Sequence, residues 1–109
     1  MSNEVLILDP RLRALLPFLD KRIDLPDSVI CMFELPMGHS FMHTNVFMFD
    51  RSGKLEWMIQ DISLPSPARS YTGIGIEASG VLSAYNFAGV SVKVDIKTGK
   101  IEESKDRPW

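Results

Sequence analysis

The stretch that decides the fold is residues 71–103, YTGIGIEASGVLSAYNFAGVSVKVDIKTGKIEE. Short apolar or alternating runs are separated there by three glycine-bearing pairs, Ser79-Gly80, Ala88-Gly89 and Thr98-Gly99. Pairs of this kind between such runs are typical of successive β-hairpins. The stretch therefore predicts a four-strand antiparallel meander.

The run that begins at Val90 has the clearest alternation. Its apolar residues are Val90, Val92, Val94 and Ile96, and the residues between them are polar. A period of two puts these apolar side chains on one face of a strand, so the meander should have one buried face and one face in water. We expect Gly99 to adopt a positive φ in the turn that follows.

Glycines at 73 and 75 leave one face of an earlier strand bare. A bare face of this kind indicates that a large side chain packs against it, and Trp57 or Tyr85 would fill the gap.

The N-terminal part carries the signals of a helix over residues 9–20. Asp9 is a favourable N-cap, and Pro10 suits the first helical position, where its missing N–H costs nothing. Leucines recur at three- and four-residue spacing, which predicts an apolar stripe that covers a sheet. Pro17 should interrupt the helix, because an interior proline removes a hydrogen bond. Residues 21–28 are expected to form a loop.

Residues 29–61 predict a strand followed by a hairpin. Residues 29–35 are apolar on both faces, which suits a central strand covered on both sides. The hairpin is expected to turn at residues 50–54, where Gly53 lies. Together these segments predict one domain, residues 1–109, of the α+β class. It should be mainly antiparallel β, a six- or seven-strand meander sheet with one N-terminal helix.

Charge and composition exclude several classes of function. Fourteen acidic residues against 12 basic ones give a net charge of −2, and no run rich in Lys or Arg is present. The electrostatic footprint of nucleic-acid binding is therefore missing. The apolar run at residues 5–8 is too short for a signal peptide or a membrane span, and a single cysteine rules out an internal disulfide framework. We expect a cytoplasmic protein that has no membrane partner and no cofactor.

Three side chains invite an enzymatic hypothesis. Cys31 lies in an apolar run and is expected to pack in the core; the alternative is a catalytic thiolate, which needs a base and an electropositive setting. His39 and His43 are four residues apart, but Pro36 and Gly38 favour a loop, and two ligands do not close a metal site. We therefore expect no bound metal and no enzyme, with an enzyme built on the histidine pair as the remaining alternative.

Residues 84–90, AYNFAGV, and residues 94–101, VDIKTGKI, place an Asn-aromatic-x-Gly turn before an alternating strand and a Thr-Gly-Lys hairpin. This arrangement resembles a pattern near the end of small bacterial proteins, several of which resemble immunity proteins of polymorphic or contact-dependent growth inhibition toxin systems. The resemblance covers about a fifth of the chain and carries no catalytic residue. It implies a non-enzymatic protein that binds and neutralises one cognate toxin domain, such as a nuclease.

Two sets of candidate binding residues follow. The acidic residues most expected to face a basic toxin are Asp20, Asp24, Asp27, Glu77, Glu102 and Glu103. The alternative function is a small-molecule or carbohydrate-binding β module, with a groove lined by aromatic residues that share a face. The residues of that groove would be Trp57, Tyr71, Tyr85 and Phe87.

Overall fold

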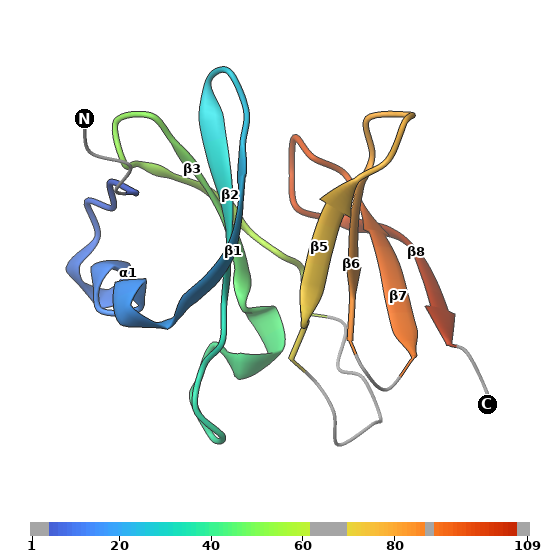
Figure 1. The fold of residues 1–109 in the computed structure, drawn as a ribbon, viewed down its shortest axis with the longest axis horizontal. Coiled ribbons are helices and arrows are strands. Elements are labelled where there is room, and N and C mark those ends of the chain that lie inside the picture. Colours follow the sequence, from blue (N-terminus) through green and yellow to red (C-terminus); the bar gives the residue numbers. More distant parts are fainter. Residues whose placement is uncertain (1–4, 62–69, 87–88, 107–109) are drawn as a thin grey trace.

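The computed structural model describes residues 5–61, 70–86 and 89–106, with side chains described as far as residue 102. Within these ranges the chain forms two four-stranded antiparallel sheets that face each other (Figure 1). The first sheet contains β1 (Leu19–Asp24), β2 (Ser28–Phe33), β3 (Val46–Asp50) and β4 (Leu55–Met58), in that order. The second contains β5 (Gly73–Ile76), β6 (Leu82–Tyr85), β7 (Val90–Val94) and β8 (Ile101–Asp106), also in chain order.

The described helical segments are short. They are the α-helix α1 (Pro10–Arg13) and the 3₁₀ helices η1 (Leu16–Phe18) and η2 (Met42–Thr44). Asp9 caps α1 as expected, accepting a hydrogen bond from the Arg11 backbone N–H at 2.9 Å. Figure 1 shows α1 on the side of the first sheet that faces away from the second sheet.

A mainly antiparallel β fold with one short N-terminal helix is confirmed. The single six- or seven-strand meander is wrong, because the eight described strands divide into two sheets. The physical reason lies in β2, whose six residues are all buried. A single sheet with one helix could cover only one face of β2, so the second sheet is needed to remove the other face from water.

The predicted helix over residues 9–20 is also much shorter in the structure. Pro17 lies within η1, and Leu19 already has extended backbone angles, φ −62° and ψ 120°. The chain then continues as β1, which pairs antiparallel with β2 where a loop was expected. β1 was missed because its six residues are mostly polar and show no apolar alternation. None of them is fully buried, as is usual for an edge strand.

Two apolar clusters form the core, one on each face of the first sheet. Ile30, Met32 and Val46 face the second sheet, where Val90, Val92 and Val94 of β7 are buried as predicted. On the opposite face, a second cluster lies between the first sheet and the N-terminal segment with α1. Its buried members are Val5, Ile7, Leu12, Leu15, Val29, Cys31, Phe33, Leu35, Phe47 and Phe49.

The turn between β7 and β8 docks onto the first sheet. The Trp57 indole N–H donates to the Ile96 carbonyl at 2.8 Å, and the Gln60 side chain accepts from the Ile101 N–H at 2.8 Å. Gly99 has φ 77°, as expected, and a Cβ there would lie 2.8 Å from the Trp57 ring. Trp57 therefore covers Gly99, while Tyr85 fills the gap over Gly73.

Candidate binding cavity

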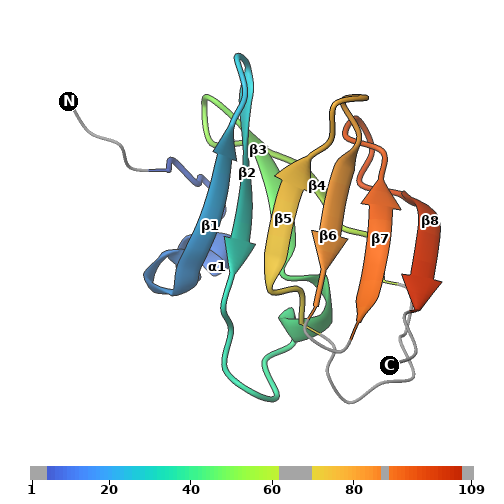
Figure 2. The ribbon, with the colours of Figure 1, turned by 45° about the vertical axis from the view of Figure 1, so that its right-hand side comes forward.

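A partly open cavity of about 410 Å³ lies at the end of the sandwich where the edge strands β1 and β5 approach each other. β1 and β5 contact each other across the two sheets, and Figure 2 shows η2, in green, at the lower end of the sandwich. The wall is formed by the start of β1, the end of β2, the following loop, η2 and the residues that lead into β5. The lining residues are Asp20, Met32, Glu34, Leu35, Met37, Met42, Ser70, Tyr71 and Thr72.

Asp20 reaches the cavity from a β-bulge. Leu19 pairs with Phe33 and Lys21 pairs with Met32, so Asp20 is an extra residue without a partner on β2. A bulge disrupts the ladder locally and redirects a side chain, and bulges are common beside functional sites. The irregularity thus sets a carboxylate at the cavity on a strand whose regular register would have placed it elsewhere.

Methionine provides much of the apolar lining. Three of the six methionines in the chain, Met32, Met37 and Met42, contribute to it. Met32 is 1% exposed and forms part of the core, whereas Met37 is 89% exposed and extends from the loop after β2. Unbranched thioether side chains adapt their shape to what they contact, so this lining can accommodate more than one apolar surface.

A buried asparagine positions the wall beside β5. Asn45 is fully buried; its amide donates to the Phe33 carbonyl at 2.8 Å and to the Tyr71 carbonyl at 2.9 Å. The Tyr71 backbone N–H donates back to Asn45 Oδ1 at 3.0 Å. The Asn45 side chain therefore links the end of β2 in the first sheet to the residues that precede β5 in the second sheet. In the same wall, the Ser70 hydroxyl donates a hydrogen bond to the Met42 carbonyl at 3.1 Å.

Tyr71 is a neutral side chain in this wall. Burial raises the pKa of its phenol to about 12, with a smaller contribution from the negative charge of Asp61. The phenol therefore keeps its proton throughout the physiological pH range and acts as a neutral polar group rather than a charge.

The charged side chains among the described lining residues are Asp20 and Glu34, and both are exposed. Within the described part of the chain, neither carboxylate has a hydrogen bond or an ion pair. The described lining of the cavity consequently combines apolar walls with two carboxylates, an arrangement that attracts a cation attached to an apolar body.

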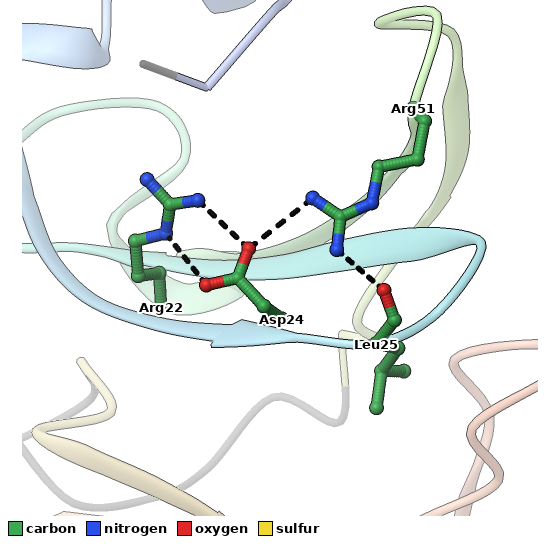
Figure 3. Close-up of polar contacts among 4 residues, drawn as sticks. All are labelled: Arg22, Asp24, Leu25 and Arg51. Atoms are coloured by element: carbon green, nitrogen blue, oxygen red, sulfur yellow. Dashed lines mark hydrogen bonds and ion pairs between the residues drawn. The ribbon is translucent and has the colours of Figure 1, made fainter. Parts of the chain in front are cut away.

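The carboxylate of Asp24, by contrast, already has ion-pair partners within the protein. Figure 3 shows its carboxylate between two guanidinium groups, with Arg22 Nη2 at 2.7 Å and Arg51 Nη1 at 3.2 Å from Oδ1. Arg51 also donates to the Leu25 carbonyl and so ties the β3–β4 turn to the β1–β2 turn. The hydrogen bond from Arg22 is the main cause of the lowered pKa of Asp24.

The other predicted acidic residues are dispersed. Glu77 pairs with Lys93 at 2.9 Å on the outer face of the second sheet. Asp27 is exposed between β1 and β2, and Glu102 is exposed on β8. The Glu103 side chain lies outside the described residues. The structure thus brings only Asp20 of this set to the cavity, where it joins Glu34.

The predicted aromatic groove is not assembled from the residues that the structure describes. Trp57 and Tyr71 are buried within the cluster between the sheets, 5% and 2% exposed. Tyr85 is 50% exposed on the opposite face of the second sheet, over Gly73, and Phe87 lies outside the described residues. Of the four, Tyr71 alone is described at the cavity.

The candidate catalytic side chains have structural settings. Cys31 is fully buried, and burial raises the pKa of its thiol to about 12, the opposite of nucleophile activation. His39 Nδ1 accepts a hydrogen bond from the Phe41 N–H at 3.1 Å, and His43 lies in η2. Among residues 5–61, 70–86 and 89–106, no three His, Cys, Asp or Glu side chains lie close enough to hold a metal ion.

Sequence reasoning missed Glu34, the methionines and Asn45. Glu34 carried a usable signal, since it is the single charged residue in the apolar run of residues 29–35 and directly follows the buried strand β2. Asn45 carried a weaker one, as an amide directly before the apolar run of β3. The cavity itself joins residues that are up to 52 positions apart, Asp20 and Thr72, so no local pattern could reveal it.

The chain is an antiparallel β-sandwich with a partly open cavity at one end, and two carboxylates belong to the described lining of that cavity. A model of a domain of unknown function, DUF7957, matches residues 2–106, and the chain belongs to this family. No curated protein and no solved structure matches the chain significantly. None of the described helices has the length and apolar character that crossing a bilayer requires.

Proposed function

We propose that this protein is a non-enzymatic, cytoplasmic immunity-type protein that binds and neutralises a cognate bacterial toxin domain. The observation that supports the proposal best is a pair of exposed carboxylates, Asp20 and Glu34, that line an apolar cavity and have no partner among the described residues. A nuclease toxin presents a basic substrate cleft, and an acidic surface with an apolar recess complements such a cleft in charge and in shape.

The cavity can supply only the centre of such an interface. Neutralising a toxin requires nanomolar affinity, about 12 kcal/mol, from an interface of roughly 800 Å² per partner. That area is about an eighth of the 6693 Å² surface of the structure. We therefore expect neighbouring exposed groups, Asp27 among them, to form a polar rim around a few anchors at the cavity.

The test is co-expression of the chain with the toxin domain encoded beside it, followed by growth rescue and complex formation across a salt series. Association should slow steeply as salt rises, because oppositely charged surfaces steer the encounter. The double variant Asp20→Asn, Glu34→Gln should slow association, whereas Glu56→Gln, an exposed acid on the opposite edge strand β4, should not. Growth rescue without a complex, or a genome with no neighbouring toxin, would contradict the proposal.

The second candidate function is a small-molecule-binding β module. The volume of the cavity, about 410 Å³, falls within the range of ligand pockets, about 300–1,000 Å³. This candidate predicts a small molecule that co-purifies with the protein and is lost when Met42 or Leu35 is replaced by a charged residue. Native mass spectrometry of the freshly purified protein distinguishes the two, because an immunity-type protein should carry no such molecule.

A further inference from the structure

We infer that the cavity is the receptor for one long basic side chain of the partner, an arginine or lysine whose stem lies on the methionines and whose charge meets Asp20 and Glu34. This inference rests on the proposed function and specifies its central contact. It commits to a basic side chain, because the described lining has an apolar interior and carboxylates as its charged groups.

The interior suits the apolar stem of such a side chain. Met32 and Leu35 are buried at 1% and 8% exposure, while Met42 and the loop residue Met37 stand nearer the opening. Lys and Arg side chains lay their methylene stems along apolar surface and keep the charged group at the wetter end. Methionine is well suited to this contact because its thioether adapts to the stem.

The rim suits the charge. Asp20 extends from the bulge on β1, and Glu34 follows β2, so two neighbouring strands present carboxylates to the same opening. Neither has a partner within the described residues, in contrast to Asp24, which already contacts two arginines. A guanidinium carries five donors in a planar fork that suits carboxylate oxygens, whereas an ammonium is a compact point charge, so arginine is the better fit of the two.

The geometry disfavours the other occupants of an apolar recess. An acidic side chain would meet like charge from Asp20 and Glu34. A purely apolar anchor would gain the methionine contacts but would leave both carboxylates beside a dry surface with no counter-charge. Only a cation with an apolar stem satisfies both parts of the wall.

The experiment uses n-butylguanidinium as the probe, with n-butylammonium, n-butanol and butyrate as matched controls. Titrations follow the ε-methyl NMR signals of the methionines in ¹³C-methyl-labelled full-length protein. The methyl groups of Met32, Met37 and Met42 should shift and saturate at millimolar probe, the affinity expected for so small a ligand. Met58, which is 39% exposed on β4 at the opposite edge of the first sheet, is the internal control and should not shift.

Charge dependence is tested with conservative variants. Asp20→Asn and Glu34→Gln should each weaken n-butylguanidinium about two- to fivefold, and the double variant should remove its advantage over n-butanol. Glu56→Gln should leave the titration unchanged, and thermal unfolding should show that every variant remains folded. Equal shifts with n-butanol and n-butylguanidinium, equal shifts at Met58, or no saturable shift would overturn the inference.

The inference and the proposed function fail in different ways. If the probe binds as expected but the neighbouring toxin forms no complex, the receptor for a basic side chain stands and the toxin partner is wrong. If the toxin binds the Asp20→Asn, Glu34→Gln variant as fast and as tightly as the natural chain, the immunity function stands and the cavity is not its anchor site.

Discussion

The two sheets of this protein differ in how many of their faces are buried. Ile30 and Cys31, adjacent on β2, are both fully buried because the first sheet lies between the second sheet and the N-terminal segment. On β7 of the second sheet, Val92 is fully buried, but the side chain of its neighbour Lys93 is 39% exposed. A strand that is apolar on both faces, such as β2, therefore needs a covering layer on each side, whereas an alternating strand such as β7 needs one.

Charge insertion should produce the largest effect. Ile30→Asp, Cys31→Asp and Val92→Asp should each unfold the protein, because burying an unpaired charge costs several kcal/mol out of a total stability of about 5–15 kcal/mol. Lys93→Gln should cost less than about 1 kcal/mol, since it removes a half-exposed ion pair with Glu77. Circular dichroism with urea unfolding measures all four.

The informative variant of that set is Cys31→Asp. Cooperative, native-like unfolding of Cys31→Asp would show that the N-terminal segment does not cover this face, and the difference between the sheets would disappear. Native-like unfolding of Val92→Asp would instead mean that the two faces of β7 are reversed.

The link between the sheets should give the next largest effect. Asn45→Ala leaves the Phe33 carbonyl and both polar backbone groups of Tyr71 without their partner in a buried site. We expect a loss of about 3–4 kcal/mol from these unsatisfied groups. Asn45→Asp keeps the acceptor for the Tyr71 N–H but loses both donors, so in the same urea series it should also destabilise. A cost below 1 kcal/mol for Asn45→Ala would show that the sheets do not depend on this side chain.

Two glycines, one in the β5–β6 turn and one in the β7–β8 turn, allow a finer comparison. Gly99 and Gly80 both have positive φ, 77° and 89°, but a Cβ at Gly99 meets the Trp57 ring at 2.8 Å and one at Gly80 meets nothing within 4 Å. Gly80→Ala should cost about 1 kcal/mol from the backbone alone, and Gly99→Ala about 2–3 kcal/mol. Gly99→Val should exceed both, and Lys97→Ala should have little effect. Equal melting temperatures for the two alanine variants would show that a Cβ at position 99 does not clash with the Trp57 ring.

The smallest effect concerns Asp24 at low pH. Its pKa is lowered in the folded protein, chiefly by the hydrogen bond from Arg22, so its contribution to stability is present above the unfolded pKa and is lost as pH falls through the folded value. The side chain is 51% exposed, which limits the contribution to a few tenths of a kcal/mol. The stability difference between the natural chain and Asp24→Asn should therefore be present at pH 7 and lost at a pH below the lowered folded pKa. A difference that is the same at both pH values would exclude the ion pair as its source.

The sequence was informative wherever one strand carries its own pattern. The alternation of Val90, Val92 and Val94 predicted the buried face of β7, and the apolar run around Cys31 predicted a strand covered on both sides. The positive φ of Gly99 followed from turn chemistry alone. Each of these features depends on a few consecutive residues, which is why local patterns were enough.

Features that depend on distant residues were not accessible in this way. β1 has a polar sequence and becomes a strand only because β2 offers it a ladder of backbone hydrogen bonds. The division into two sheets depends on which layer covers the second face of β2. The cavity depends on that division, so Asp20 was predicted as a toxin-facing acid at the end of a helix, and Glu34 was not predicted as a site residue.

The hydrogen bond between the Tyr71 amide and Asn45 has a consequence for hydrogen exchange. Tyr71 precedes β5, so its N–H belongs to no strand ladder, and its acceptor is a side chain of the first sheet. Exchange of this proton with deuterium therefore requires the two sheets to separate, or Asn45 to release the chain, while the ladders remain intact. Its protection factor, compared with those of the β6 and β7 amides, would measure the free energy of opening the sandwich separately from that of unfolding it.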